Sequence, residues 1–221
     1  MKMRNFLGVL LIAASVGALA LIPEALAGSP AAGTADGCKV VRAPLPRVEH
    51  LHRPLQTVSR SDRLVAIVKT NCGRFQIRLD ARRSPTIVNS FVYMVRSGFY
   101  RGLPFYRVVP NFVVQAGDPR AEGTGGPGYT VTEPPPKHFH FRLGTVAMAK
   151  AYEEPVGRAG SIFFVCAGQG RYIKNEYAVL GQVQAGISTI KKIAALGSLP
   201  DEEASQTVKI DWIKIRNLGR S

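Results

Sequence analysis

The sequence has little of several features that define other protein classes. Among its 221 residues there are only three cysteines and one tryptophan, and aromatic residues make up 8%. There is no heptad run, no solenoid repeat and no long low-complexity tract, which argues against a coiled coil or a repeat array. With 46% hydrophobic and 20% charged residues, the composition is that of one globular domain with appendages.

The one long apolar run lies at the start of the chain. A basic start precedes residues 6–22, which are apolar or small; Pro23 interrupts the run, and Ala25-Leu26-Ala27 has the small-x-small form that signal peptidase accepts. This pattern predicts a signal peptide over residues 1–27 and an exported protein, periplasmic or secreted. The alternative is an uncleaved N-terminal segment that anchors the chain. Membrane contact is expected only transiently, through this segment, because later segments are too short or too polar to span a bilayer.

Export permits disulfide bonds. Cys166 ends the apolar run 162–166, which is typical of a core strand, so we expect it to be a buried free thiol. Cys38 and Cys72 remain as candidates for a pair, although sequence alone does not assign partners. We predict that they are bridged because both lie outside the apparent core.

The net charge is strongly positive, at +14 for the whole chain. Without residues 1–27 it is +13, from 27 basic and 14 acidic residues. Such a charge favours acidic partners and anionic surfaces, but the basic residues are scattered, so we predict a solvated surface and no specific nucleic-acid binding. Segments 138–140 and 49–52 contain histidines but lack further ligands at a recognisable spacing. We therefore predict no metal and no cofactor.

The distribution of residue types along the chain predicts an N-terminal extension over residues 28–62 and a folded domain over residues 63–218. Ser84 and Pro85 are typical of a helix start, Gly98 of its end, and residues 187–196 predict a second helix. Many short strands with few helices indicate a closed or sandwiched β architecture. The strand-like segments are 64–68, 75–79, 105–115 apart from Pro110, 144–149, 162–167, 177–183 and 208–215.

The most informative stretch is residues 105–118, which read F-Y-R-V-V-P-N-F-V-V-Q-A-G-D. It resembles the signature of the cyclophilin-type peptidyl-prolyl cis-trans isomerases. Four further family strings follow in the same order, at residues 123–129, 144–149, 160–165 and 177–183. The resemblance implies an eight-stranded antiparallel closed β-barrel capped by two α-helices. It also implies a monomeric isomerase of a bacterial-like exported branch, which acts on X–Pro bonds of proline-containing polypeptides and assists their folding.

The chemistry of that reaction explains the residue types. Amide resonance sets a barrier of about 18–20 kcal/mol to rotation. When the amide twists, the proline nitrogen regains a lone pair, and a fixed donor aimed there stabilises the twisted state alone. Arginine suits this role because it is always protonated and presents a rigid fork of donors.

Position by position, the resemblance assigns a role to each site residue. Arg107 would be the donor, and Gln115 would hold a substrate carbonyl and help to orient Arg107. The proline ring would lie in an apolar pocket formed by Phe112, Val113, Phe164 and Ile173. The substrate backbone would run along Ala149 and Lys150, with Tyr172 and Tyr177 completing the rim.

Several positions depart from the family pattern. Tyr106 stands in place of a common His, Tyr172 in place of Trp, and Ile162 in place of a Gln that bonds substrate backbone, while the loop 150–160 is longer than usual. The last two changes, Ile162 and the longer loop, favour one alternative function, a proline-peptide binding module or chaperone with little or no turnover. Retention of Arg107 together with the pocket phenylalanines favours the enzyme.

Overall fold

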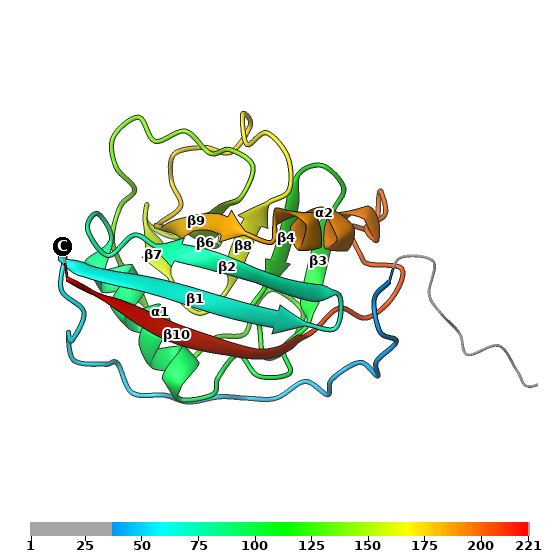
Figure 1. Ribbon diagram of the computed structural model, residues 1–221, viewed down its shortest axis with the longest axis horizontal. Coiled ribbons are helices and arrows are strands. Elements are labelled where there is room, and N and C mark those ends of the chain that lie inside the picture. Colours follow the sequence, from blue (N-terminus) through cyan, green and yellow to red (C-terminus); the bar gives the residue numbers. More distant parts are fainter. Residues whose placement is uncertain (1–36, 221) are drawn as a thin grey trace, which may run out of the picture. The chain divides into compact units, whose positions relative to one another are not determined.

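The structure, a computed structural model, describes residues 37–220, so the predicted signal peptide lies outside the described residues. Within that range no helix has the length and apolarity needed to cross a bilayer. In chain order (Figure 1) the elements are β1 (Asp62–Thr70), β2 (Gly73–Leu79), α1 (Pro85–Arg96), β3 (Phe105–Val109), β4 (Val113–Ala116), β5 (Val131–Thr132), β6 (Thr145–Met148), β7 (Arg158–Ala159), β8 (Phe163–Cys166), β9 (Val179–Ala185), α2 (Ile187–Ala195) and β10 (Ile210–Arg220).

Eight antiparallel strands form one curled sheet in the order β10-β1-β2-β9-β6-β8-β4-β3, and β5 pairs with β7. The expectation of a closed barrel is wrong, since β10 and β3 are edges joined only by a bridge between Pro104 and Lys209. The cause lies between α2 and β10, where the chain passes along β3 as an irregular loop. That loop accepts the N–H groups of Phe105 and Val108, so it covers the edge without forming a ladder.

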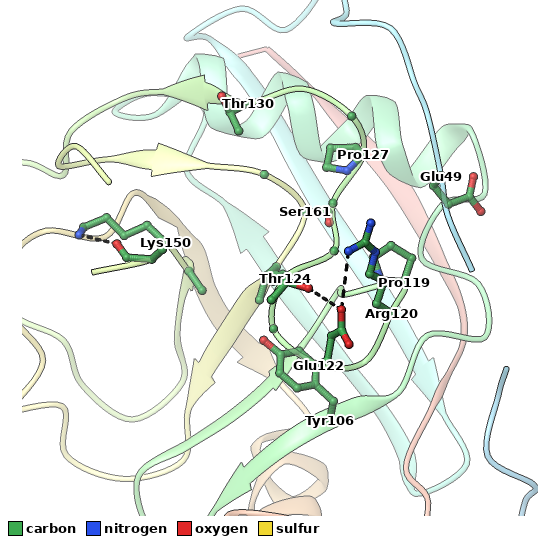
Figure 2. A pocket seen from close by; sticks show the side chains of 18 of the residues that line it. Glu49, Tyr106, Pro119, Arg120, Glu122, Thr124, Pro127, Thr130, Lys150 and Ser161 are labelled. Carbon is green, nitrogen blue, oxygen red and sulfur yellow. Dashed lines mark hydrogen bonds and ion pairs between the residues drawn. The ribbon is translucent and has the colours of Figure 1, made fainter. Parts of the chain in front are cut away.

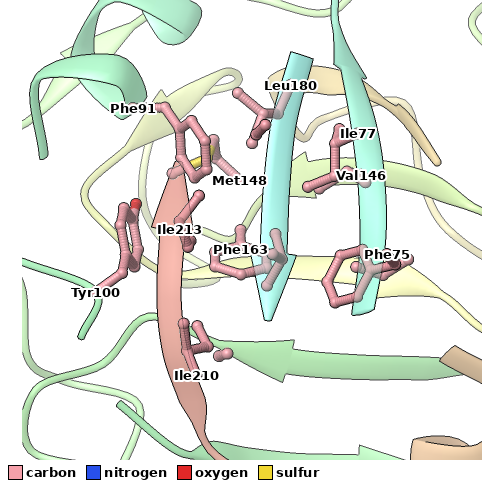
Figure 3. Packing of buried hydrophobic residues seen from close by; sticks show 14 of the residues in the cluster. Phe75, Ile77, Phe91, Tyr100, Val146, Met148, Phe163, Leu180, Ile210 and Ile213 are labelled. Atoms are coloured by element: carbon pink, nitrogen blue, oxygen red, sulfur yellow. The ribbon is translucent and has the colours of Figure 1, made fainter. Parts of the chain in front are cut away.

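Strict alternation along the strands explains the core. Side chains of a strand point to opposite faces in turn, and Phe75, Ile77, Val146 and Phe163 all point into one buried cluster (Figure 3). Helix α1 adds Phe91, which packs edge-on against Phe163 with ring centroids 6.1 Å apart. The core therefore fills the inner face of the curled sheet, and the outer face of β3, β4, β6 and β8 is left for other contacts.

The start of α1 depends on a residue far away in the sequence. Ser84 is the N-cap, as expected, but its side chain makes no capping hydrogen bond. Instead, the Glu133 carboxylate accepts a hydrogen bond from the N–H of Ile87 at 3.0 Å. Burial raises the pKa of Glu133, while the backbone hydrogen bonds act in the opposite direction. A carboxylate at a helix N-terminus also interacts favourably with the helix dipole.

Residues 37–61 of the extension pack along the domain as an ordered segment. A disulfide joins Cys38 to Cys72, and the side chain of Asn71 donates to the carbonyl of Lys39 at 2.8 Å. At the other end the Asn89 amide oxygen accepts the N–H groups of Thr57 and Val58. Backbone groups that would otherwise lose water are thereby paired, so this segment is part of the folded unit.

We predict that the disulfide contributes about 3–4 kcal/mol to the free energy of unfolding, because it closes a loop with a sequence separation of 34. Cys38→Ser/Cys72→Ser should lose that amount in a denaturant titration. Reduction should destabilise the wild type equally and the double variant not at all. Equal stability of oxidised wild type and double variant would contradict this prediction.

The third cysteine gives a separate test. Cys166 is fully buried and free, and burial raises its pKa to about 12, so the reactive thiolate is scarce at neutral pH. A thiol reagent should label no cysteine in the native unreduced protein and one after denaturation. Three labelled thiols would mean that the bridge is absent.

Candidate active site

A single row of side chains crosses the outer face of the sheet. Arg107 on β3 lies opposite Gln115 on β4, Gln115 lies opposite Phe164 on β8, and Phe164 lies opposite Ala147 on β6. Their neighbours Val108 and Val114 point into the core. Because paired residues in antiparallel strands share a face, the register alone brings four distant parts of the chain into one line.

A β-bulge sits at one end of this row. Phe105 pairs with Ala116 and Arg107 pairs with Gln115, so Tyr106 is an extra residue without a partner. Bulges of this kind re-aim a side chain, and here the Gln115 amide donates a hydrogen bond to the Tyr106 hydroxyl. Burial raises the pKa of Tyr106 to about 12, so the phenol is neutral at physiological pH.

Beside the row lies a second, smaller apolar cluster. The structure brings together five of the residues expected at the proline pocket and its rim, which are Phe112, Val113, Phe164, Ile173 and Tyr177. Ala149 also packs against them. Its buried members lie on the opposite side of the sheet from the main core, and Phe112, Ile173 and Tyr177 are only half-buried, so part of this apolar surface is open to a ligand.

Two phenylalanines of this cluster were missed by the sequence reasoning. The ring centroid of Phe141 lies 6.1 Å from that of Phe164 and 6.4 Å from that of Tyr177, and Phe139 packs edge-on against Phe141 at 5.2 Å. Both lie in a loop without regular structure, where no periodicity points to burial. The signal that could have found them was the presence of two aromatic residues in a polar stretch. Only the histidines of that stretch were considered as candidate site residues.

A cleft of about 850 Å³ adjoins the row at Arg107 and Gln115 (Figure 2 shows part of its lining). It is lined by Tyr106, Arg107 and Gln115, by Ala149 and Lys150, and by Ile162, whose side chain offers the cleft no polar group. The far wall comes from the glycine-rich loop, residues 123–128, and from residues 47–50 of the extension. Sequence reasoning missed this contribution because the extension carries no motif and no period.

The glycine-rich loop is held by one buried carboxylate. Asp118 accepts hydrogen bonds from the N–H groups of Arg120 at 2.7 Å, Glu122 at 3.0 Å and Gly123. A Cβ at Gly125 would lie 2.0 Å from an oxygen of Asp118, so only glycine fits this close approach. The wall of the cleft is therefore a rigid turn.

The polar residues have partners that differ from the expected ones. The Gln115 amide is bonded to Tyr106 and makes no hydrogen bond to Arg107 among the described residues. Arg107 instead donates from Nε to Oε2 of Glu202 at 2.5 Å. Sequence reasoning missed Glu202, since it lies 95 residues away in an irregular loop.

Two rim residues are placed differently from each other. Tyr177 packs edge-on against Phe164 with ring centroids 5.4 Å apart, and Lys150 Nζ lies over its ring at 5.9 Å and 3.6 Å from a carboxylate oxygen of Glu176. Tyr172 is 89% exposed and lies outside the apolar cluster. Among the residues that the structure describes, no group of three or more His, Cys, Asp or Glu side chains could hold a metal ion.

Comparison with known proteins identifies this arrangement. The family model described as "Cyclophilin type peptidyl-prolyl cis-trans isomerase/CLD" matches residues 65–215. The chain is 37% identical over 134 residues to a peptidyl-prolyl cis-trans isomerase of Helicobacter pylori, covering 58% of this chain and 78% of that one. It is 36% identical over 125 residues to isomerase B of Bacillus subtilis, covering 55% and 84%.

A solved structure shares the fold. A cyclophilin-type isomerase of Cryptosporidium parvum superimposes with a TM-score of 0.63 at 26% identity, covering 70% of this chain and 98% of that one. The same protein in the presence of the dipeptide Ala-Pro gives a TM-score of 0.64 at 24% identity. Fold and relatives together define a peptidyl-prolyl cis-trans isomerase, and the chain belongs to the cyclophilin family. The resemblance found in the sequence is confirmed.

We predict stability effects of different size for the two rim tyrosines. Tyr177→Ala should lower the free energy of unfolding by about 1–2 kcal/mol, because it removes aromatic contacts from the cluster. Tyr172→Ala should change it by less than about 0.5 kcal/mol, as expected for an exposed side chain. Thermal melts of both variants check this, and a large loss for Tyr172→Ala would show that the residue packs in solution.

Proposed function

We propose that this cyclophilin isomerises X–Pro bonds of exported polypeptides, acts as a monomer and assists their folding. The observation that carries the catalytic part is the position of Arg107, which lines the cleft and stands in the same row as Gln115 and Phe164 of the apolar cluster. Its Nε is bonded to Glu202, and its two terminal nitrogens have no hydrogen-bond partner among the described residues. They are therefore available to a ligand.

The arrangement can perform the rotation in a defined way. The proline ring packs on Phe112, Val113 and Phe164, which holds one side of the bond, and the flanking backbone lies along the cleft at Ala149. Rotation needs no covalent intermediate, because the barrier is amide resonance. As the amide twists, the proline nitrogen gains a lone pair, and the terminal nitrogens of Arg107 donate to it in the twisted state only.

Replacement of Arg107 is the direct test. Arg107→Ala should lower kcat by about a hundredfold to a thousandfold, the typical loss for one preorganised donor, with a much smaller change in KM. Arg107→Lys should restore little, since an ammonium lacks the planar fork. The measurement is isomerisation of a proline-containing peptide by proteins whose thermal melts show that they fold.

Phe112→Ala provides the contrast, because emptying the apolar pocket should weaken substrate binding and turnover together. If folded Arg107→Ala kept near-normal turnover, the assignment of Arg107 would be wrong. If the wild type bound proline peptides without accelerating their isomerisation, the chain would be a binding module. The apolar Ile162 in the cleft wall is the feature that favours that second function.

Export of the protein rests on residues 1–27 and is supported by the bridge between Cys38 and Cys72, since such bonds persist in oxidising compartments. We predict that the mature protein begins at Gly28. N-terminal sequencing of protein recovered from the periplasm or medium checks this. Recovery of the full-length chain from the membrane fraction would support the anchored alternative instead.

A further inference from the structure

The ion pair between Arg107 and Glu202 is a polar contact of the proposed donor itself that the catalytic proposal does not use. Arg107 Nε and Glu202 Oε2 are 2.5 Å apart, and the two side chains are 33% and 38% exposed. An exposed ion pair of this kind contributes little to folding. The position of the ion pair matters more for function, because it joins the proposed donor to the loop between α2 and β10, which has no other part in the site.

Backbone contacts fix Glu202 next to Arg107. The carbonyl of Glu202 accepts the N–H of Val108 at 2.6 Å, one residue from Arg107, and the Glu202 N–H is bonded to the carbonyl of Ser198 at 3.1 Å. A Cβ at Gly197 would lie 2.4 Å from the carbonyl oxygen of Val108, so the loop can approach β3 this closely only with glycine there. Both ends of segment 197–202 are therefore held against the strand that carries the arginine.

Glu202 also has an unusual backbone conformation. Its φ is 57°, in the left-handed region that residues other than glycine, asparagine and aspartate rarely adopt. Such conformations persist where the surrounding structure imposes them, and they are concentrated at functional sites. Here the hydrogen bonds of Ser198 and Val108 impose it, and the result is a carboxylate that reaches the guanidinium.

No other described side chain takes this role. Gln115 faces Arg107 across the strand pair, but its amide donates to the Tyr106 hydroxyl. Arg107 has no other hydrogen bond from its side chain among the described residues. The orientation of the guanidinium plane is thus set by the contact between Nε and Glu202.

We infer that Glu202 is a positioning residue, which fixes the guanidinium of Arg107 so that its two terminal nitrogens face the twisting X–Pro bond. This rests on the proposed role of Arg107. Guanidinium is planar, so a charge-assisted hydrogen bond at Nε defines the directions of the remaining donors. A donor that must search for its orientation gives up part of the advantage of preorganisation.

The test compares three variants of the full mature protein on one proline peptide. Glu202→Ala should lower kcat about tenfold and change KM less than twofold, because the contact acts on the twisted state and not on ground-state binding. Glu202→Gln should recover most of the loss, since the amide oxygen still accepts from Nε. Glu203→Gln is the matched control. Glu203 is the next residue in the chain and its side chain is exposed, so this variant should behave as wild type.

A double-mutant cycle separates positioning from a general effect on the loop. In the Arg107→Ala background, Glu202→Ala should cause no further loss of kcat, measured by NMR exchange between the cis and trans peptide. The Arg107 Nε–H resonance should exchange slowly with water in wild type and in Glu202→Gln, and quickly in Glu202→Ala.

The outcomes are distinct. The positioning role is overturned if Glu202→Ala lowers kcat tenfold in the Arg107→Ala background as well. It is also overturned if Glu202→Ala has wild-type kcat while Arg107→Ala is inactive. Near-normal turnover in Arg107→Ala overturns the proposed mechanism itself.

Discussion

The antiparallel register of β3, β4, β8 and β6 is the constraint on which the rest of this structure depends. It aligns Arg107, Gln115, Phe164 and Ala147 across four strands. Because side chains alternate between the two faces of a strand, the valines next to these residues point into the core. A slip of one residue would send the arginine inward and the core residues outward. The same hydrogen-bond ladder therefore positions both the core on one face and the candidate site on the other.

The outer face combines two environments that an isomerase of X–Pro bonds needs. An apolar cluster around Phe112 and Phe164 suits the proline ring, whereas the adjoining cleft is lined by the polar residues Gln115 and Lys150. Arg107 is common to the row and the cleft. Because the aromatic side chains pack edge-on against one another, the pocket is formed before a ligand arrives, and little binding energy is lost in ordering it.

The extension shows how a segment with no repeating pattern can become part of a site. It is joined to the first hairpin by the disulfide at Cys38 and to α1 through Asn89. Between these points the N–H of Leu51 bonds to the carbonyl of Pro127, in the glycine-rich loop. Residues 47–50 thus lie along the cleft. The order of residues 37–61 depends on hydrogen bonds of their backbone to partners throughout the domain, and on few buried side chains, such as Val58.

The sequence by itself determined the family and the positions of the main strands and of both helices along the chain, because these follow from local periodicity and from motifs in fixed order. It also indicated the residues that assemble around Phe112 and Phe164. Tertiary structure alone decided the open edge between β3 and β10, the contribution of Phe141, the exposure of Tyr172 and the partner of Arg107. Each of these depends on the path of an irregular loop, such as the left-handed turn at Glu202. Contacts between such loops and residues some 95 positions away are set by the packing of the whole sheet, and no local pattern encodes them.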